Sequence, residues 1–291
     1  DHIYKQNVRQ MVDFHYRKRA FATVACLPIP IEEAYQYGIV NIDSEGRIIG
    51  FDEKPREAKC IPGDPKHALA SMGNYIFDPD ALSRELIADA KRESHHDFGR
   101  NIIPSMLESG RVFAYDFRLN RIPGSASQEE NMYWRDVGTI EAYFEATMDL
   151  KNVVPSLNLY NWEWPILTAS YSDPPAKMVF DEPGRRGQIL QSVVCGGCII
   201  AGGSVKDSVL GRNVFVDEGA DVRDSIIFDN VYIGKGARVS KAIIDKNNRV
   251  ADGDMVGHDL ARDALRHFVS EGGITVVSKA RDTLLTRSRN F

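Results

Sequence analysis

A repeat of 17 residues in the last third of the chain constrains its fold more than any other feature. Residues 214–230, VFVDEGADVRDSIIFDN, align with residues 231–247, VYIGKGARVSKAIIDKN, so that Val222 matches Val239. Residues 197–213 fit the same alignment. Small aliphatic residues recur about every six positions, which is typical of a three-sided coil with one inward side chain per face. We therefore predict a parallel β-helix in which about 17 residues form one turn.

A cap is expected beyond the repeat. Residues 261–268 have a helical pattern, Gly272 and Gly273 form a turn, and residues 274–277 are typical of a strand. Because the last coil of a β-helix has unpaired edges, we expect this segment to cover it. The β-helix with its cap is predicted to span residues 188–291.

Residues 1–152 alternate helical and strand patterns, which predicts an α/β sheet domain with ligands at the carboxyl ends of its strands. Asp78 and Thr139 are candidate helix N-caps, and Pro79 suits the first helical position. The expected helices are 7–19, 79–87, 101–108 and 140–150, and the expected strands are 22–29, 39–42, 47–51, 68–77, 112–117 and 132–137. Residues 153–187 are rich in Pro and Trp and are predicted to be a linker or docking segment.

The composition argues against several classes of protein. A net charge of −5 gives no basic footprint for nucleic acid or for an anionic membrane surface. No apolar run approaches the roughly 20 residues that span a bilayer. Four cysteines are too few for a disulfide scaffold, so a reducing, cytoplasmic setting is expected. Cys195 and Cys198 have zinc-like spacing, but no second pair accompanies them, and a structural role is the better interpretation.

Four short segments place polar residues at expected strand ends: DHIYK at 1–5, GFDEKP at 50–55, ASMGNY at 70–75 and YWRDVGT at 133–139. Asp1 and Asp136 are two carboxylates of the kind that hold Mg²⁺ together with substrate phosphates. Lys54 offers a compact cation for a phosphate, and Glu53 can accept hydrogen bonds from sugar hydroxyls. Each charge taken alone has a simpler interpretation as a solvated or paired surface group.

As a set, these segments resemble the sugar-nucleotide pyrophosphorylases, and specifically the bacterial glucose-1-phosphate adenylyltransferases (ADP-glucose pyrophosphorylases). The resemblance covers essentially the whole chain, through DHIYK, FDEKP, ALASMGNYIF, HHDFGRNIIP, YWRDVGTIEAY, VVPSLNLY and PPAKMVF. Many nucleotidyltransferases share an FDEKP-type motif. The combination of YWRDVGT, PPAK and a β-helix is much more specific and favours the adenylyltransferases. The resemblance implies part of a Rossmann-like nucleotidyltransferase sheet followed by a left-handed parallel β-helix.

The resemblance also implies an activity. The family transfers the adenylyl group of ATP to glucose 1-phosphate, giving ADP-glucose and pyrophosphate for the synthesis of glycogen or starch-type α-glucans. It further implies Mg²⁺ as cofactor, a homotetramer and a small anionic allosteric effector.

Residue by residue, the resemblance implies that Asp1 and Asp136 bind the catalytic Mg²⁺. Glu53 and Lys54 hold glucose 1-phosphate, with Lys54 on its phosphate, and Asp1, Asp136 and Lys54 form the catalytic set. Gly38 and Ser71 contact the sugar, and a glycine allows close approach of the backbone to a ligand. In the HHDFG motif, Asp97 is expected to orient neighbouring groups. Arg266 and Lys279 are the candidates for binding the anionic effector.

The chain departs from the family pattern in three places. The Gly-rich loop that cradles the nucleotide phosphates has no counterpart in these 291 residues. Together with the start at Asp1, this leads us to expect the back portion of a larger enzyme, inactive by itself. Asn74 stands where an aliphatic residue is expected, and Val269 stands where bacterial relatives carry Arg near their effector site.

Two alternatives remain at this point. The chain could belong to a nucleotidyltransferase for another sugar phosphate, or to a non-catalytic regulatory subunit of the same architecture. The sequence argues against coil-borne acyl transfer, which needs a histidine among the coils, because none lies between His96 and His258. His95, His96 and Asp97 also suggest a metal cluster, but adjacent histidine side chains diverge, and a helix entry explains them better.

Overall fold

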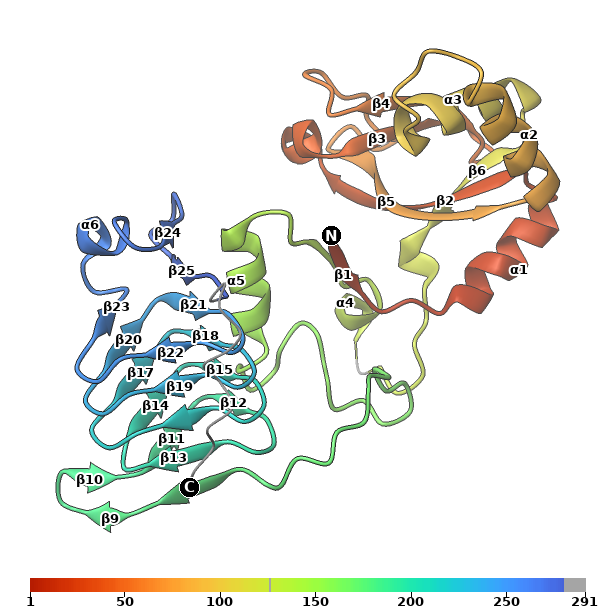
Figure 1. Cartoon of the computed structure of the whole chain (residues 1–291). Coiled ribbons are helices and arrows are strands. Elements are labelled where there is room, and N and C mark those ends of the chain that lie inside the picture. The colour runs from red at the N-terminus through yellow and green to blue at the C-terminus, as the bar shows by residue number, and fades with distance from the viewer. Residues whose placement is uncertain (126, 280–291) are drawn as a thin grey trace. The chain divides into compact units, whose positions relative to one another are not determined.

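A computed structural model describes residues 1–125 and 127–279, which form two compact units (Figure 1). Among the described residues, the sheet unit lies within Tyr4–Trp134, and the β-helix unit comprises Asp1–Ile3 and Arg135–Lys279. The basic end of the predicted cap, residues 280–291, lies outside the described residues. The domain boundaries predicted at residues 152 and 188 stay predictions. No helix in the described part is long and apolar enough to cross a membrane.

The sheet unit is built on five strands in the order β4-β3-β5-β2-β6. They are β2 (Ala22–Pro30), β3 (Gly38–Ile42), β4 (Ile48–Glu53), β5 (His67–Phe77) and β6 (Val112–Asp116). The predicted hairpin is confirmed, since β3 and β4 pair antiparallel with Val40 opposite Phe51. Strand β2 runs parallel to β6 and antiparallel to β5, so the sheet is mixed.

Helices cover both faces of this sheet, which explains the apolar run of β2. Val24 and Cys26 join one buried cluster with residues of α2 (Pro79–Asp89) and α3 (Ile103–Met106). The intervening Ala25 joins another cluster with Met11 of α1 (Val8–Lys18). Successive side chains of a strand point to opposite faces, so a strand covered on both sides is apolar throughout.

The prediction of one regular helix at residues 101–108 is wrong, because this segment contains three kinds of helical turn. The structure has a π turn at Phe98–Ile102, then α3, then a 3₁₀ turn at Leu107–Ser109. Pro104 has no backbone N–H to donate to the preceding turn, so the α-helical hydrogen-bond pattern begins afresh at α3, where Pro104 lies in the first turn. By contrast, the Asp78 cap is confirmed: its carboxylate accepts a hydrogen bond from the Ala81 amide at 2.9 Å, and Pro79 begins α2.

Shorter elements connect these parts. They are β1 (His2–Tyr4), a 3₁₀ helix (Ile31–Gln36), another (Phe117–Leu119), α4 (Gln128–Asn131), β7 (Trp134–Asp136) and α5 (Ile140–Asp149). Strand β1 pairs with β7. Thr139 accepts a hydrogen bond from the Ala142 amide at 3.1 Å, which confirms it as the N-cap of α5.

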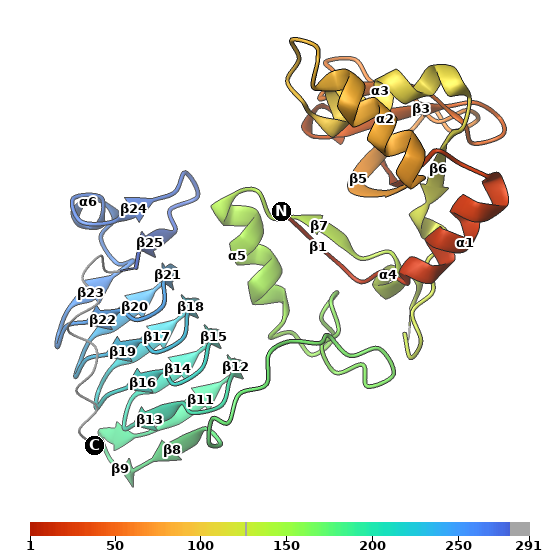
Figure 2. The ribbon, with the colours of Figure 1, turned by 45° about the vertical axis from the view of Figure 1, so that its right-hand side comes forward.

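The predicted three-sided β-helix is confirmed, and its coils stack into three sheets (Figure 2). The first contains β11 (Gln188–Leu190), β14 (Ser204–Lys206), β17 (Asp221–Arg223), β20 (Arg238–Ser240) and β23 (Met255–Val256). The second contains β12 (Val193–Val194), β15 (Val209–Leu210), β18 (Ile226–Ile227), β21 (Ala242–Ile244), β25 (Thr275–Val277) and β24 (Phe268–Val269). The third contains β8 (Lys177–Val179), β13 (Ile199–Ala201), β16 (Phe215–Val216), β19 (Tyr232–Ile233) and β22 (Arg249–Val250).

Strand register reproduces the period of the sequence. Val205 pairs with Val222 and Val222 with Val239, each 17 residues further along the chain. All three are fully buried in the core of the coil. A short antiparallel hairpin, β9 (Asp181–Glu182) and β10 (Arg185–Arg186), projects at the first coil.

The cap is partly helical and partly strand. The predicted helix 261–268 is shorter than expected, because α6 covers Leu260–Asp263 and Phe268 already belongs to β24. Strands β24 and β25 form an antiparallel hairpin, and β25 pairs with β21 of the coil. The Asp263 carboxylate accepts hydrogen bonds from the Gly257 amide at 2.6 Å and from Thr275 Oγ1 at 3.0 Å. These bonds fasten the cap to the last coil.

Helix α5 packs on the outside of the β-helix. Its side chains Ile140, Tyr143, Phe144 and Met148 surround a buried cluster of Ile226, Ile243 and Ile274. The ring of Tyr143 stacks on that of Phe228, with centroids 6.4 Å apart. This contact fixes the helix that follows the YWRDVGT motif against the coils.

Candidate functional site

The two aspartates expected to bind metal lie at a pair of strands, with Asp1 directly before β1 and Asp136 at the end of β7. The Val137 amide donates to the Asp1 carbonyl oxygen at 2.8 Å, which joins the chain at β1 to the end of β7. Asp136 Oδ1 accepts a hydrogen bond from the Gly138 amide at 3.0 Å and lies 3.8 Å from His2 Nε2. Its side chain is 39% exposed, and Asp1 is exposed. Two solvent-accessible carboxylates at one strand pair are a donor set that fits Mg²⁺ with water or phosphate completing its shell.

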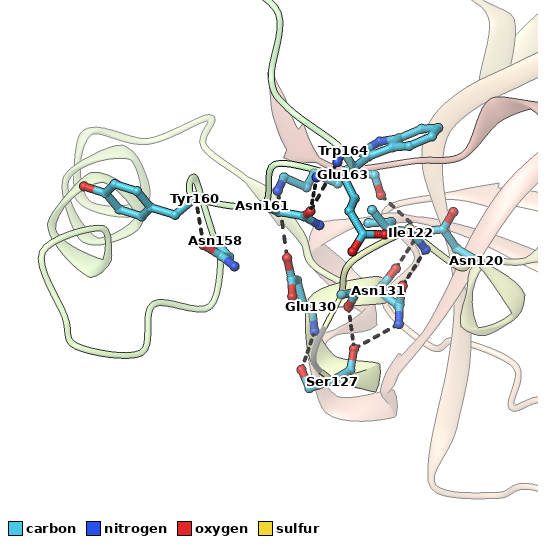
Figure 3. Close-up of polar contacts among 12 residues, drawn as sticks. Asn120, Ile122, Ser127, Glu130, Asn131, Asn158, Tyr160, Asn161, Glu163 and Trp164 are labelled. Atoms are coloured by element: carbon cyan, nitrogen blue, oxygen red, sulfur yellow. Dashed lines mark hydrogen bonds and ion pairs between the residues drawn. The ribbon is translucent and has the colours of Figure 1, made fainter.

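A buried polar network fixes the segments on either side of this strand pair within the sheet unit. Fully buried Asn120 donates from Nδ2 to the carbonyl oxygens of Lys5 at 3.1 Å and Asn131 at 2.7 Å. Asn131 Oδ1 accepts from the Ile122 amide, and its Nδ2 donates to the Ser127 carbonyl oxygen (Figure 3). Lys5 follows Asp1 by four residues and Asn131 precedes Asp136 by five, so this network constrains both segments.

Lys5 itself is only 5% exposed and lies 3.8 Å from Glu130 Oε1. Burial lowers the pKa of its ammonium group, and the Glu130 carboxylate opposes that shift. Each partner neutralises the other, as a buried charge requires.

Gly38, Glu53 and Lys54 lie together at one end of the β3–β4 hairpin. Gly38 pairs with Glu53, and a side chain on Gly38 would come within 3.0 Å of Glu53 Oε2 and of the Phe51 ring. The Lys54 amide donates to the Tyr37 carbonyl oxygen at 3.0 Å. Lys54 has a φ of 48°, a left-handed conformation that side chains other than Gly, Asn and Asp seldom adopt. Such strain is typical of functional sites and here fixes the direction in which Lys54 leaves the strand.

Ser71 lies on the neighbouring strand β5 beside Tyr75. Gly73, with a φ of 74°, lies between them at an irregularity where Ser71 pairs with Cys26 and Tyr75 with Val24. The Gly73 amide donates to Ser71 Oγ at 3.3 Å. The bulge therefore lies between the two residues of this strand that carry hydroxyl groups.

The pKa of Tyr75 is raised. Burial of its phenol is the largest cause, the Ser71 hydroxyl opposes the rise, and the carboxylates of Asp97 and Glu53 add to it. The ring of Phe98 stacks on that of Tyr75, with centroids 6.0 Å apart. The segments that carry Glu53 and Asp97 also approach each other, because a Cβ added at Gly38 or at Gly99 would lie 3.0 Å from the same Phe51 ring. Together with Ser71 and Tyr75 of β5, these residues form one group.

Sequence reasoning missed Tyr75 and Phe98 as members of this group. Tyr75 ends the ASMGNY motif, four positions after Ser71, and residues i and i+4 of a strand share a face. That period could have identified Tyr75, whereas nothing in the sequence brings Phe98 to it.

The effector candidates lie at the cap. Arg266 binds the Asp254 carboxylate through both terminal nitrogens, at 3.2 and 2.8 Å, and Arg262 contacts the same group at 3.1 Å. These hydrogen bonds lower the pKa of Asp254. The Lys279 amide donates to Asp245 Oδ2 at 3.2 Å. A surface hollow of about 590 Å³ lined by Arg266, Arg249 and His267 lies beside β22 and β24.

Other sequence candidates have structural partners. Cys198 is fully buried among the coil residues and donates to the Gly211 carbonyl oxygen, while Cys195 is exposed. His96 contacts Asp89. Across residues 1–125 and 127–279, no cluster of three or more His, Cys, Asp or Glu side chains could hold a metal ion.

Comparison with known families agrees with the architecture. The family model described as "Nucleotidyl transferase" matches residues 1–153, and that described as "GlmU-like, C-terminal hexapeptide" matches residues 174–277. The mixed sheet, the hexapeptide coils and these matches define a nucleotidyltransferase with a C-terminal β-helix.

Curated relatives narrow the class further. The glucose-1-phosphate adenylyltransferase of Thermus thermophilus is 52% identical over 282 residues, covering 96% of this chain and 68% of the relative. The enzymes of that name from Anaeromyxobacter sp. and Aliivibrio fischeri are 47% and 46% identical, again over 96% of this chain, and 69% and 68% of those relatives are covered. The chain belongs to the glucose-1-phosphate adenylyltransferase family, which confirms the resemblance seen in its motifs.

Proposed function

We propose that the chain binds glucose 1-phosphate for adenylyl transfer from ATP, which yields ADP-glucose and pyrophosphate. The observation that carries this is the approach of the segments that carry Glu53 and Asp97 to the Phe51 ring, in the same sheet unit as Ser71 of β5. Carboxylates and hydroxyls in one place suit the several hydroxyl groups of a hexose. Gly38 keeps the backbone open beside Glu53, and the ammonium group of Lys54 neutralises the sugar's phosphate.

The reaction needs positioning more than covalent chemistry. A phosphate oxygen of glucose 1-phosphate attacks the α-phosphorus of ATP in line, a P–O bond forms, and the bond to pyrophosphate breaks. Asp1 and Asp136 are proposed to hold Mg²⁺, which when bound neutralises charge on the phosphates. Asp136 is held for this role by the Gly138 amide on Oδ1.

Calorimetric titration of the chain with glucose 1-phosphate tests the binding part of this proposal. We expect saturable binding that Glu53→Gln and Ser71→Ala each weaken about tenfold, because each removes one polar contact. Glucose without its phosphate should bind more weakly than glucose 1-phosphate, since Lys54 then has no anionic partner. Equal binding of the two sugars would contradict the role of Lys54.

A substrate panel separates the remaining alternatives. Pyrophosphate release is measured with ATP, UTP, GTP and dTTP against glucose, galactose and mannose 1-phosphates, using the protein in its natural full length. Selective turnover of ATP with glucose 1-phosphate supports the proposal. Selectivity for another pair would assign a different nucleotidyltransferase activity, and absence of turnover with every pair would favour a regulatory subunit.

We further propose that the protein assembles as a homotetramer, acts in the cytoplasm and binds a small anionic effector at the cap. The hollow beside Arg266 supplies two guanidinium groups, from Arg266 and Arg249, and one imidazole, from His267. Equilibrium sedimentation tests the assembly. Titration with sugar bisphosphates and inorganic phosphate tests the effector site, and Arg249→Ala should weaken it.

A further inference from the structure

The sheet unit contains a serine, histidine and aspartate cluster that the proposed reaction does not use. Asp89, the last residue of α2, has a 12% exposed side chain. His96 Nδ1 lies 2.7 Å from Asp89 Oδ2, and Ser94 Oγ donates to Asp89 Oδ1 at 2.8 Å. The His96 amide donates to Ser94 Oγ at 3.1 Å. The carboxylate therefore holds both ends of a short loop against the end of α2.

The arrangement differs from that of a nucleophilic triad. In such a triad the serine and the carboxylate contact opposite nitrogens of the imidazole. Here Ser94 Oγ lies 3.1 Å from Nδ1, the same nitrogen that contacts Asp89. The cluster therefore lacks the contacts that relay a proton, and its hydrogen bonds hold the loop to the end of α2.

His96 has a strained backbone. Its φ is 54°, in the left-handed region that residues other than Gly, Asn and Asp seldom adopt. A residue keeps such a conformation where its surroundings enforce it, and these residues concentrate at functional sites. The contacts of its imidazole and amide with Asp89 and Ser94 provide that enforcement.

His96 lies directly before Asp97 and Phe98, which approach Tyr75 in the proposed sugar-binding group of Glu53, Ser71 and Tyr75. Asp97 Oδ1 accepts from the Arg100 amide at 2.8 Å, and the Asp97 carbonyl oxygen accepts from the Asn101 amide at 2.9 Å, so Asp97 caps the π turn. Phe98, the next residue, stacks on Tyr75. The direction of the chain at His96 thus decides where the Asp97 carboxylate and the Phe98 ring lie.

We propose that Asp89, Ser94 and His96 form a clip that positions Asp97 and Phe98 for the hexose of glucose 1-phosphate. His96 is a positioning residue that does not itself touch the sugar. This inference rests on the proposed function, because it assigns Asp97 and Phe98 to the same sugar-binding group as Tyr75.

Three variants of the chain test the clip: His96→Gly, His96→Asn and, as the matched control, His95→Gly at the exposed neighbour. Glycine accepts the positive φ but has no side chain for Asp89, whereas asparagine tolerates that φ and keeps an amide donor. Calorimetry with glucose 1-phosphate should show binding about tenfold weaker in His96→Gly, the equivalent of one lost charge-assisted hydrogen bond, and near wild type in His96→Asn and His95→Gly. Hydrogen exchange should speed up at the amides of residues 97–102 in His96→Gly alone.

Each result has a separate meaning. Wild-type affinity and exchange in His96→Gly would overturn the clip while leaving the proposed function intact. Faster exchange with unchanged affinity would show that the loop is fastened but plays no part in binding the sugar, which also overturns the inference. If the wild-type chain itself fails to bind glucose 1-phosphate, the proposed function fails, and the role of the clip in sugar binding fails with it.

Discussion

Glu141 Oε1 accepts a hydrogen bond from the Gly272 amide at 2.9 Å, which ties the first turn of α5 to the turn before β25. Lys241 Nζ donates to the Gly272 carbonyl oxygen at 2.7 Å, so both the amide and the carbonyl group of Gly272 are held. Helix α5 begins four residues after Asp136. The cap that carries the effector candidates is therefore joined to the segment that carries a proposed metal ligand.

Gly272→Ala should weaken the contact between Glu141 of α5 and the turn before β25. A Cβ at position 272 would lie 2.9 Å from Glu141 Cγ and 3.0 Å from Oε1, closer than side chains normally approach. We expect the midpoint of thermal unfolding to fall by a few degrees. Glu271→Ala, at the exposed adjacent position, is the control and should leave the midpoint unchanged. An unchanged midpoint in both variants would show that the turn adjusts without cost.

The same contact predicts a pH dependence. The hydrogen bonds that Glu141 receives, first from Ser270 and then from the Gly272 amide, lower the pKa of its carboxyl group in the folded protein. A lowered folded pKa stabilises the fold above the unfolded value of about 4.3, and that stabilisation is lost as pH falls through the folded pKa. The difference in unfolding midpoint between wild type and Glu141→Gln should therefore be larger at neutral pH than under acid conditions. A difference that grows on acidification would contradict the assignment.

Lys54→Ala should affect one substrate selectively. Loss of the ammonium group is expected to raise the Michaelis constant for glucose 1-phosphate about 10- to 100-fold, as for a charge-assisted hydrogen bond, and to leave that for ATP nearly unchanged. Steady-state kinetics on the full-length protein provides the measurement, with exposed Lys59→Ala as the control. Equal effects on both constants would count against the phosphate role of Lys54.

Asp136→Asn should lower turnover at least about tenfold and raise the Mg²⁺ concentration needed for half-maximal rate, because an amide is a weaker ligand than a carboxylate for a hard cation. The measurement is the rate of ADP-glucose formation against Mg²⁺ concentration. Asp13→Asn, on the exposed side of α1, is the matched change of charge. Wild-type turnover in Asp136→Asn would remove Asp136 from the metal site.

The β-helix should be sensitive to cavities at its inward positions. Ile227 is fully buried among the coils, so Ile227→Ala is expected to lower the free energy of unfolding by about 2–5 kcal/mol. Leu190→Ala removes a similar side chain that is 51% exposed and should cost much less. Urea unfolding followed by circular dichroism compares the two. Equal losses would indicate that Ile227 does not carry the packing assigned to it.

Sequence alone determined the features that depend on local order. The 17-residue repeat predicted the register of the coils, because parallel stacking pairs each residue with its equivalent in the next turn. Asp78 and Thr139 predicted two helix starts, because a cap is a contact within one turn of chain. The motifs also predicted the family.

Only the tertiary structure decided which of these residues act together. Phe98 reaches Tyr75 from a π turn where a regular helix was expected, and a bulge in β5 lies between Tyr75 and Ser71. The clip at Asp89 and the bond between Glu141 and Gly272 likewise join separate segments. Such contacts depend on strand order and on where loops return to the sheet or coil. A local pattern does not contain that information, because it is set by burial of the whole core.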